Sequence, residues 1–273
     1  MNIFTPAEIV ENYSNAGEKR VKNTVGRMLV LGIFAGFFIA AGGMIANTAA
    51  HLLPDAGAIR LVSGLLFPAG LIMVVLTGAE LFTGAVLLVM PLLARRIKAA
   101  RMLWLWLVVY VGNFVGAFAL AAGCALFGQL GISGGQLAVY TIKVAATKCA
   151  INPANALVSG ILCNILVCVA VLMSLSAKDT FGKAAGAYVP IAVFVIAGLE
   201  HSIANVFFIS AGLLALAVPD YANLAIAAKL DVSALTWGGF LARHLLPVTI
   251  GNIIGGALVG AGMWYTQSKP IKR

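Results

Sequence analysis

Long stretches without a formal charge constrain the fold of this chain more than any other feature of its sequence. Four stretches contain no Asp, Glu, Lys or Arg: Met28–Ala50, Met102–Phe127, Cys149–Ala177 and His244–Ser268. Each reaches the roughly 20 residues that an α-helix needs to cross a bilayer. Only 10% of the 273 residues are charged, which is too few to coat a soluble domain of this size. We therefore predict an integral membrane protein with the lipid bilayer as a partner.

Two further apolar segments, Leu61–Ala94 and Lys183–Pro219, bring the expected number of spans to six. As a straight helix the first would be about 50 Å long, whereas the hydrocarbon core measures about 30 Å. Both segments must therefore tilt steeply or break. Each contains an acid two residues after a glycine, Glu80 in the first and Glu200 in the second. We expect both helices to be interrupted there.

A second pair of motifs shows that the two halves of the chain repeat each other. Span three contains Gly112–Gly116 and span six contains Gly251–Gly255, and both read G-N-x-x-G. A repeat of three spans reverses its orientation in the membrane, and interrupted helices at matching positions of inverted halves mark a transport site. The predicted fold is an all-α membrane protein with six transmembrane helices in two inverted three-helix repeats, helices 2 and 5 being broken. The alternative is that both interruptions are structural kinks and do not mark a transport site.

The basic residues are distributed unequally between the two sides of the membrane. Thirteen fall before span one, between spans two and three, after span four, or at the chain end, and five fall on the opposite side. By the positive-inside rule the first side, with both termini, is cytoplasmic. The net charge of +9 is then topological, so anionic lipid headgroups rather than nucleic acid are the expected partner. We divide the chain into a cytoplasmic N-terminal amphipathic segment (1–27), a six-span channel domain (28–268) and a cytoplasmic tail (269–273).

The N-terminal segment carries the signals that start a helix. Thr5 and Glu8 form a capping-box pattern around Pro6, which suits the first helical position. The side chains expected to face the membrane or the bundle are Ile9, Val10, Tyr13 and Ala16.

Ionisable residues inside a membrane are costly and mark functional sites by default. Three lie in the broken segments: Glu80, Glu200 and His201. For both acids we favour a role as acceptors for backbone N–H groups that the breaks set free, with proton relay or cation binding as the alternative. His201 has no ionisable counterpart in the other half, where Leu81 stands, so a functional role as hydrogen-bond donor or proton donor is favoured.

The remaining candidates are neutral amides, a hydroxyl and one lysine. Thr83 and Asn205 offer hydrogen bonds near the breaks, while Asn164 and Asn252 either hold helices together or line a pore. Lys148 precedes span four as a solvated anchor or a functional cation. Asn152-Pro153-Ala154 spells a water-channel signature, but we interpret it as an asparagine cap before a helix-starting proline. No metal site or cofactor is expected.

Five motifs in order resemble the formate/nitrite transporter family over nearly the whole chain. They are Leu31–Gly36, Gly78–Gly84, Gly160–Cys168, Glu200–Asn205 and Pro247–Gly256. The resemblance implies a homopentamer of aquaporin-like protomers, each with its own pore. It implies that His201 and Thr83 face each other at the pore centre, that Lys148 attracts anions in the outer vestibule, and that Asn164 lies beside the pore. Phe67 with Phe194, and Leu71 with Leu81, would form two apolar constrictions.

We therefore expect a channel for small monovalent anions of weak acids, formate first, with protons as a second partner through His201. Nitrite and hydrosulfide are alternatives within the family, and the sequence does not separate them from acetate or lactate. The expected location is a bacterial inner membrane. An intramembrane enzyme using Glu200 and His201 is the alternative of another class, but the chain lacks an H-E-x-x-H motif and a nucleophile elbow.

Overall fold

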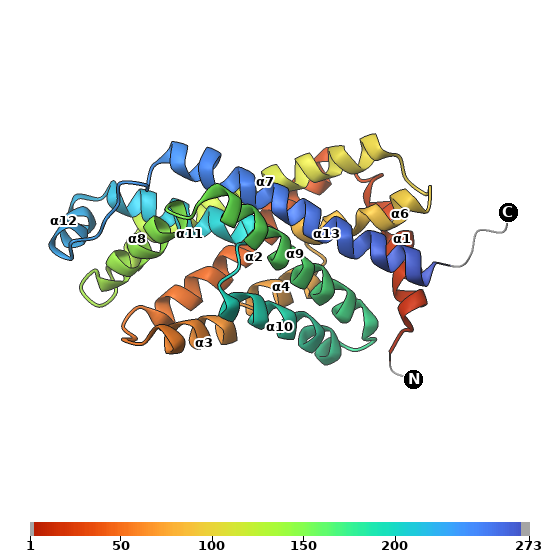
Figure 1. Ribbon diagram of the computed structural model, residues 1–273, viewed down its shortest axis with the longest axis horizontal. Coiled ribbons are helices and arrows are strands. Elements are labelled where there is room, and N and C mark those ends of the chain that lie inside the picture. Colours follow the sequence, from red (N-terminus) through yellow and green to blue (C-terminus); the bar gives the residue numbers. More distant parts are fainter. Residues whose placement is uncertain (1–2, 269–273) are drawn as a thin grey trace.

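The computed structural model describes residues 3–268, and this part of the chain is helical throughout its regular structure (Figure 1). The α-helices are α1 (Pro6–Arg20), α2 (Val25–Ala50), α3 (Ala56–Leu66), α4 (Ala69–Thr77), α5 (Phe82–Ala85), α6 (Val89–Leu93), α7 (Ala99–Leu126), α8 (Gln136–Cys149), α9 (Pro153–Ser176), α10 (Thr180–Ala197), α11 (Ser202–Leu216), α12 (Pro219–Ala227) and α13 (Leu246–Gln267). Within residues 3–268, six helical stretches are long and apolar enough to cross a membrane. The predicted all-helical six-span fold is confirmed.

The two halves of the chain use the same arrangement of helices. In the first half α2 packs against α7, and the second span, α3 with α4, is interrupted before α5 and α6. In the second half α9 packs against α13, and α10 is interrupted before α11. The interruptions fall at Gly78 and Gly198, whose φ angles of 72° and 71° lie in the left-handed region that favours glycine. Both predicted breaks are confirmed.

The G-N-x-x-G glycines let the paired helices touch through their backbones. A Cβ on Gly116 would lie 2.0 Å from the carbonyl oxygen of Ile33 on α2. A Cβ on Gly255 would lie 2.1 Å from the carbonyl oxygen of Ile161 on α9. Small residues at such crossings permit the close packing on which helix association in lipid depends. The motif therefore fixes the same helix pair in each half.

The segments that carry most of the basic residues come together at one end of the molecule, which we call the basic end. Phe4 N donates to Ser176 O at 2.8 Å, and Arg96 donates to the Glu11 carboxylate at 3.0 Å. These contacts bring the start of the chain, the α6–α7 connection and the α9–α10 connection together, as predicted from the charges. Lys269, Lys272 and Arg273 of the predicted set lie outside the described residues. The opposite end, the far end, is tied by Gln129 to Thr48 on α2 at 3.0 Å.

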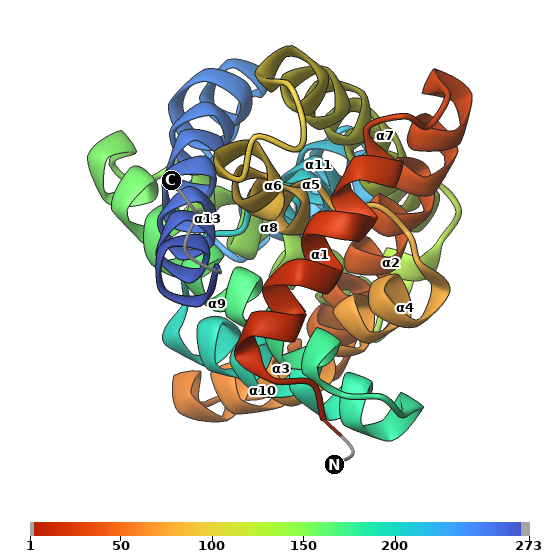
Figure 2. The same cartoon turned by 90° about the vertical axis from the view of Figure 1, so that its right-hand side faces the viewer.

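Helix α1 lies across the basic end in front of α5 and α6 (Figure 2). The capping box is formed, and hydrogen bonds from the backbone and side chain of Thr5 lower the pKa of the Glu8 carboxyl. Ile9, Val10 and Tyr13 are buried as expected. Ala16 is exposed and does not face the bundle, whereas Gly17, which was not predicted, is buried. A Cβ on Gly17 would lie 2.8 Å from the Leu88 side chain, so α1 packs there too closely for a larger residue.

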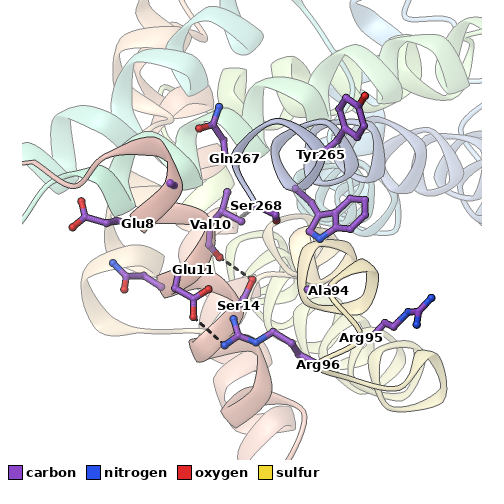
Figure 3. Close-up of a pocket in the computed structure, with 13 residues that line it drawn as sticks. Glu8, Val10, Glu11, Ser14, Ala94, Arg95, Arg96, Tyr265, Gln267 and Ser268 are labelled. Carbon is purple, nitrogen blue, oxygen red and sulfur yellow. Dashed lines mark hydrogen bonds and ion pairs between the residues drawn. The ribbon is translucent and has the colours of Figure 1, made fainter. Parts of the chain in front are cut away.

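A groove of about 1010 Å³ opens between α1, the α6–α7 connection and the end of α13 (Figure 3). Arg96 reaches into it and binds Glu11 of α1, while Tyr265 of α13 points outward. None of the candidate pore residues lines this groove. It is a surface hollow beside α1 and the end of α6, and none of the residues at the two breaks lines it.

Local signals set where spans four and six begin. The predicted cap and start of span four are confirmed: Asn152 accepts a hydrogen bond from Ala154 N and Pro153 starts α9, while Cys149, at the start of the uncharged stretch, ends the separate helix α8. Span six begins before its predicted start, with a π-helical segment at Gly239–Leu245 that runs into α13. Pro247 lacks an N–H to bond the preceding turn, and a widened turn accommodates that loss. His244 consequently lies inside the helix and is fully buried.

Candidate functional site

His201 and Thr83 meet where the two broken helices resume. His201 is the N-cap of α11 and Thr83 lies in the first turn of α5. The Thr83 Oγ1 to His201 Nε2 distance is 2.9 Å, and both side chains are buried. The backbone N–H of Ala204 donates to His201 Nδ1 at 3.0 Å. Because that bond occupies the Nδ1 lone pair, the ring proton lies on Nε2, and a neutral His201 directs an N–H toward Thr83.

A small cavity of about 10 Å³ adjoins His201, about the room that one water molecule needs. Its other walls are apolar: Ile39, Phe67, Leu71, Leu81, Val167, Ile191 and Phe194. The Phe67 and Phe194 rings meet edge to face at 5.7 Å, and Phe194 stacks on the His201 ring at 6.0 Å. The structure thus brings the four predicted constriction residues and His201 around one narrow cavity. Ile39, Val167 and Ile191 were not predicted.

Two helix N-termini converge beside this cavity. Helix α11 begins at Ser202, and the helical stretch Phe82–Leu93 begins on the other side of Thr83 and His201. The N-terminus of a helix carries a positive partial charge, and interrupted membrane helices direct such ends at anionic substrates. The centre of the molecule can therefore stabilise a negative charge without placing a cation there.

Two asparagines satisfy the backbone that the breaks leave open. Asn113 Oδ1 accepts from Phe82 N at 2.8 Å, and its Nδ2 donates to Glu80 O at 2.8 Å. Asn252 Oδ1 accepts from Ser202 N at 2.9 Å, and its Nδ2 donates to Glu200 O at 3.2 Å. The expectation that the carboxylates of Glu80 and Glu200 take up the freed N–H groups is therefore wrong. Asn113 was not predicted as a site residue, although it occupies the same position in the first G-N-x-x-G motif as Asn252 does in the second.

Asn164 joins the same structural frame. Its Nδ2 donates to the carbonyl oxygens of Asn252 at 2.6 Å and Thr83 at 3.3 Å, and the side chain is fully buried. It does not line the cavity beside His201. Its contacts tie span four to the backbone of Thr83, which places it next to the site.

Glu200 holds a polar cluster toward the far end. Its Oε2 accepts from Lys148 Nζ at 2.8 Å and from Asn205 Nδ2 at 2.7 Å. The Lys148 side chain is 18% exposed and projects from the last turn of α8, where the negative helix end also favours a cation. Lys148 is thus an ion-paired residue and not a freely solvated anchor.

Glu80 holds the matching ion pair toward the basic end. Arg20, the last residue of α1, donates from Nε to Glu80 Oε1 at 2.7 Å, with a second nitrogen on Oε2. Arg20 also donates to the Tyr13 hydroxyl, which in turn donates to Gly84 O at 2.9 Å. Each break therefore receives a cation from the helix that precedes its own repeat, α1 or α8. From the sequence, Arg20 was predicted only as one of the basic residues that set the orientation of the protein in the membrane.

His244 is a further residue that the sequence analysis missed. Its Nε2 lies 2.9 Å from Asn205 Nδ2 and 3.4 Å from Glu200 Oε2. Its position in the sequence could have indicated it, because His244 precedes Asn252 by eight residues, a spacing that puts both on one helix face. Among residues 3–268, no group of three or more His, Cys, Asp or Glu could hold a metal ion, and all four cysteines are free and buried.

Comparison with known proteins identifies relatives along the whole chain. A family model described as formate/nitrite transporter matches residues 7–266. The chain is 36% identical to the formate channel FocA of Haemophilus influenzae over 259 residues, covering 93% of this chain and 91% of the relative. It is 36% identical to FocA of Escherichia coli K12 over 269 residues, covering 96% and 94%.

Two solved structures share the fold. One is described as a pentameric formate channel with formate bound; it has a TM-score of 0.76 at 32% identity and covers 88% of this chain and 96% of that one. The other is described as an FNT family ion channel; it has a TM-score of 0.80 at 25% identity and covers 94% and 98%.

Proposed function

The chain belongs to the formate/nitrite transporter family, and from that premise we propose that it is a channel for small monovalent anions of weak acids, formate first. The observation that carries the proposal is the centre of the molecule, where the Nε2–H of a neutral His201 adjoins an apolar cavity between two helix N-termini. A carboxylate oxygen of formate is a natural acceptor for that N–H. The names of the relatives support the choice of formate over nitrite and hydrosulfide.

The proposed path runs between the two ion pairs. Lys148, which is paired with Glu200, attracts anions at the far end. Arg20, which is paired with Glu80, receives them at the basic end. Between them the anion must pass the Phe67, Leu71, Leu81 and Phe194 side chains. A bare charge in such a place costs several kcal/mol. The Nε2–H of His201 and the hydroxyl of Thr83 are the groups that offset this cost.

Proton coupling through His201 is the second part of the proposal, and it requires a change in the hydrogen bonds of the His201 ring. A neutral His201 ring can donate a hydrogen bond from Nε2–H but does not transfer that proton to the anion. To protonate an anion, the ring must first gain a proton on Nδ1, which displaces the Ala204 N–H that now binds there. If this exchange occurs as the anion arrives, the neutral acid can cross the apolar cavity and lose its proton on the other side.

The basic end is proposed to face the cytoplasm of a bacterial cell, with the protein in the inner membrane. The positive-inside rule supports this orientation, and the FocA relatives come from bacteria. A homopentamer is proposed from the description of the formate-bound structure. Large apolar side chains lie exposed on α2, α7, α10 and α13, as lipid or neighbouring protomers require.

A flux panel tests the proposed function. Purified protein in liposomes is given formate, nitrite, hydrosulfide, acetate and lactate in separate runs against protein-free liposomes. We expect formate to move fastest through the protein. Absence of protein-dependent formate flux, in a preparation that light scattering shows to be an intact oligomer, would overturn the proposal.

A further inference from the structure

A second buried histidine, His244, lies against the carboxylate that holds Lys148. It belongs to the π-helical segment Gly239–Leu245 and has a relative exposure of 0%. Its Nε2 faces Asn205 Nδ2 at 2.9 Å and Glu200 Oε2 at 3.4 Å. Its Nδ1 is buried and has no hydrogen-bond partner within residues 3–268. The geometry described so far assigns this ring no part in the passage of an anion.

No single protonation state of His244 satisfies all of the hydrogen-bonding groups in and around its ring. Asn205 Nδ2 has two protons, one directed at Glu200 Oε2 and one at His244 Nε2. That second bond needs a lone pair on Nε2, so the ring proton sits on Nδ1, where it is buried without an acceptor. When Nε2 carries a proton instead, that N–H faces Glu200 Oε2, and Asn205 loses an acceptor.

The protonation state of His244 sets the charge of the whole cluster. With a neutral ring, Lys148 and Glu200 cancel each other, so the cluster has no net charge. With a charged ring, Glu200 lies between two cations, and the cluster carries one positive charge. The other ionisable groups on the elements packed around the segment, or next to it in the chain, are Tyr140, Lys143 and Cys149 on α8, Cys163 and Cys168 on α9, His201 before α11, Arg243, and Tyr265 on α13. Only Glu200 forms an ion pair with His244 among the described residues.

We propose that His244 is a positioning residue that makes the far-end mouth, the partly exposed region around Lys148, respond to acid by competing with Lys148 for Glu200. A proton from water in the mouth is added to Nε2, and Asn205 gives up its bond to that atom. Glu200 Oε2 then accepts from His244, and the Lys148 ammonium, which keeps its three protons, loses its partner and is free for an incoming anion. The inference rests on the proposed function, because it concerns the same anion path.

The change of one unit charge at an aqueous mouth has a modest and salt-dependent effect. At a separation of about 8 Å in a water-like dielectric, one extra charge raises the local concentration of a monovalent anion on the order of two- to threefold. Salt at about 0.5 M shortens the screening length to roughly 4 Å and removes most of this gain. A purely structural histidine would give neither the pH dependence nor its loss in salt.

The test measures formate uptake by right-side-out membrane vesicles containing the full chain, at fixed internal pH. External pH is lowered from about 7.5 to 5.5, across the ordinary titration range of histidine, and vesicles without the protein are subtracted. His244→Asn keeps a polar side chain that does not titrate. His51→Asn is the control, because His51 lies in the far-end loop bonded to Ser133 and touches none of the cluster.

We expect wild type and His51→Asn to gain two- to threefold in uptake on acidification relative to His244→Asn, with the difference lost in high salt. Superimposable pH profiles for wild type and His244→Asn would overturn the inference while leaving the proposed function intact. Absence of uptake by wild type at every pH would overturn the proposed function itself. If His244→Asn does not assemble, His244→Gln provides the same comparison.

Discussion

Replacing either motif asparagine by alanine tests whether these amides hold the broken helices open. Asn113→Ala removes the acceptor for Phe82 N–H and the donor for the carbonyl oxygens of Gly32 and Glu80. Asn252→Ala removes the equivalent bonds to Ser202, Gly160 and Glu200. The two substitutions should therefore destabilise the protein to a similar degree, although they lie in opposite halves.

The magnitude follows from three bonds at a fully buried site. An unsatisfied buried N–H costs about 1–3 kcal/mol, and two lost bonds to carbonyl oxygens add about 0.5–1 kcal/mol each in a membrane protein. The expected loss for each variant is about 2–5 kcal/mol. With an unfolding entropy of about 2.1 cal/mol/K per residue, this corresponds to a Tm lower by roughly 3–9 °C.

Thermal unfolding of the purified oligomer, followed by size exclusion after heating, measures this loss. Asn47→Ala is the matched control, because Asn47 is also a buried helical asparagine but its amide nitrogen has no partner among the described residues. It should change the Tm much less than the two motif variants. The reasoning is refuted if Asn113→Ala and Asn252→Ala unfold at the wild-type temperature, or no earlier than Asn47→Ala.

Two further predictions concern the path of the anion. Lys148→Glu should reduce formate flux most at low ionic strength, since the Lys148 side chain is partly exposed and salt screens an exposed charge; equal flux in variant and wild type at low salt would count against an electrostatic role. Phe194→Ser should wet the apolar cavity and admit larger or more strongly hydrated anions, because a narrow apolar ring excludes ions by dewetting. Selectivity across an anion size series, measured in liposomes, would stay unchanged if Phe194 did not line the path.

The sequence predicts the spans and the breaks because both depend on local composition. Long apolar stretches identify the six spans, and Gly78 and Gly198 mark the interruptions because each adopts a left-handed φ. Helix α8 was not predicted, since its 14 residues are too few to cross a bilayer and include Lys143 and Lys148. Such a helix has no composition signal that separates it from a polar loop.

The site was predicted less completely, because partners distant in sequence decide it. The resemblance to the family implied the pairing of Thr83 with His201, and the structure places their atoms 2.9 Å apart. The partner of Glu80, however, is Arg20, which lies 60 positions earlier and looked like one more topological charge. His244 was not predicted because it stood at the predicted start of a span, whereas the π-helical segment Gly239–Leu245 extends that span to earlier residues, and the His244 side chain is fully buried.

The measurement that tests the central claim most directly compares wild type with His201→Asn in formate-loaded liposomes. Formate flux and internal pH are recorded together between about pH 5 and 8, where a histidine can change its protonation state. If His201 lends a hydrogen bond and then a proton at the constriction, the variant should assemble normally but lose proton-coupled formate flux, and any residual current should be insensitive to pH. An unchanged pH profile with unchanged coupling in His201→Asn would contradict a central role for this histidine in transport.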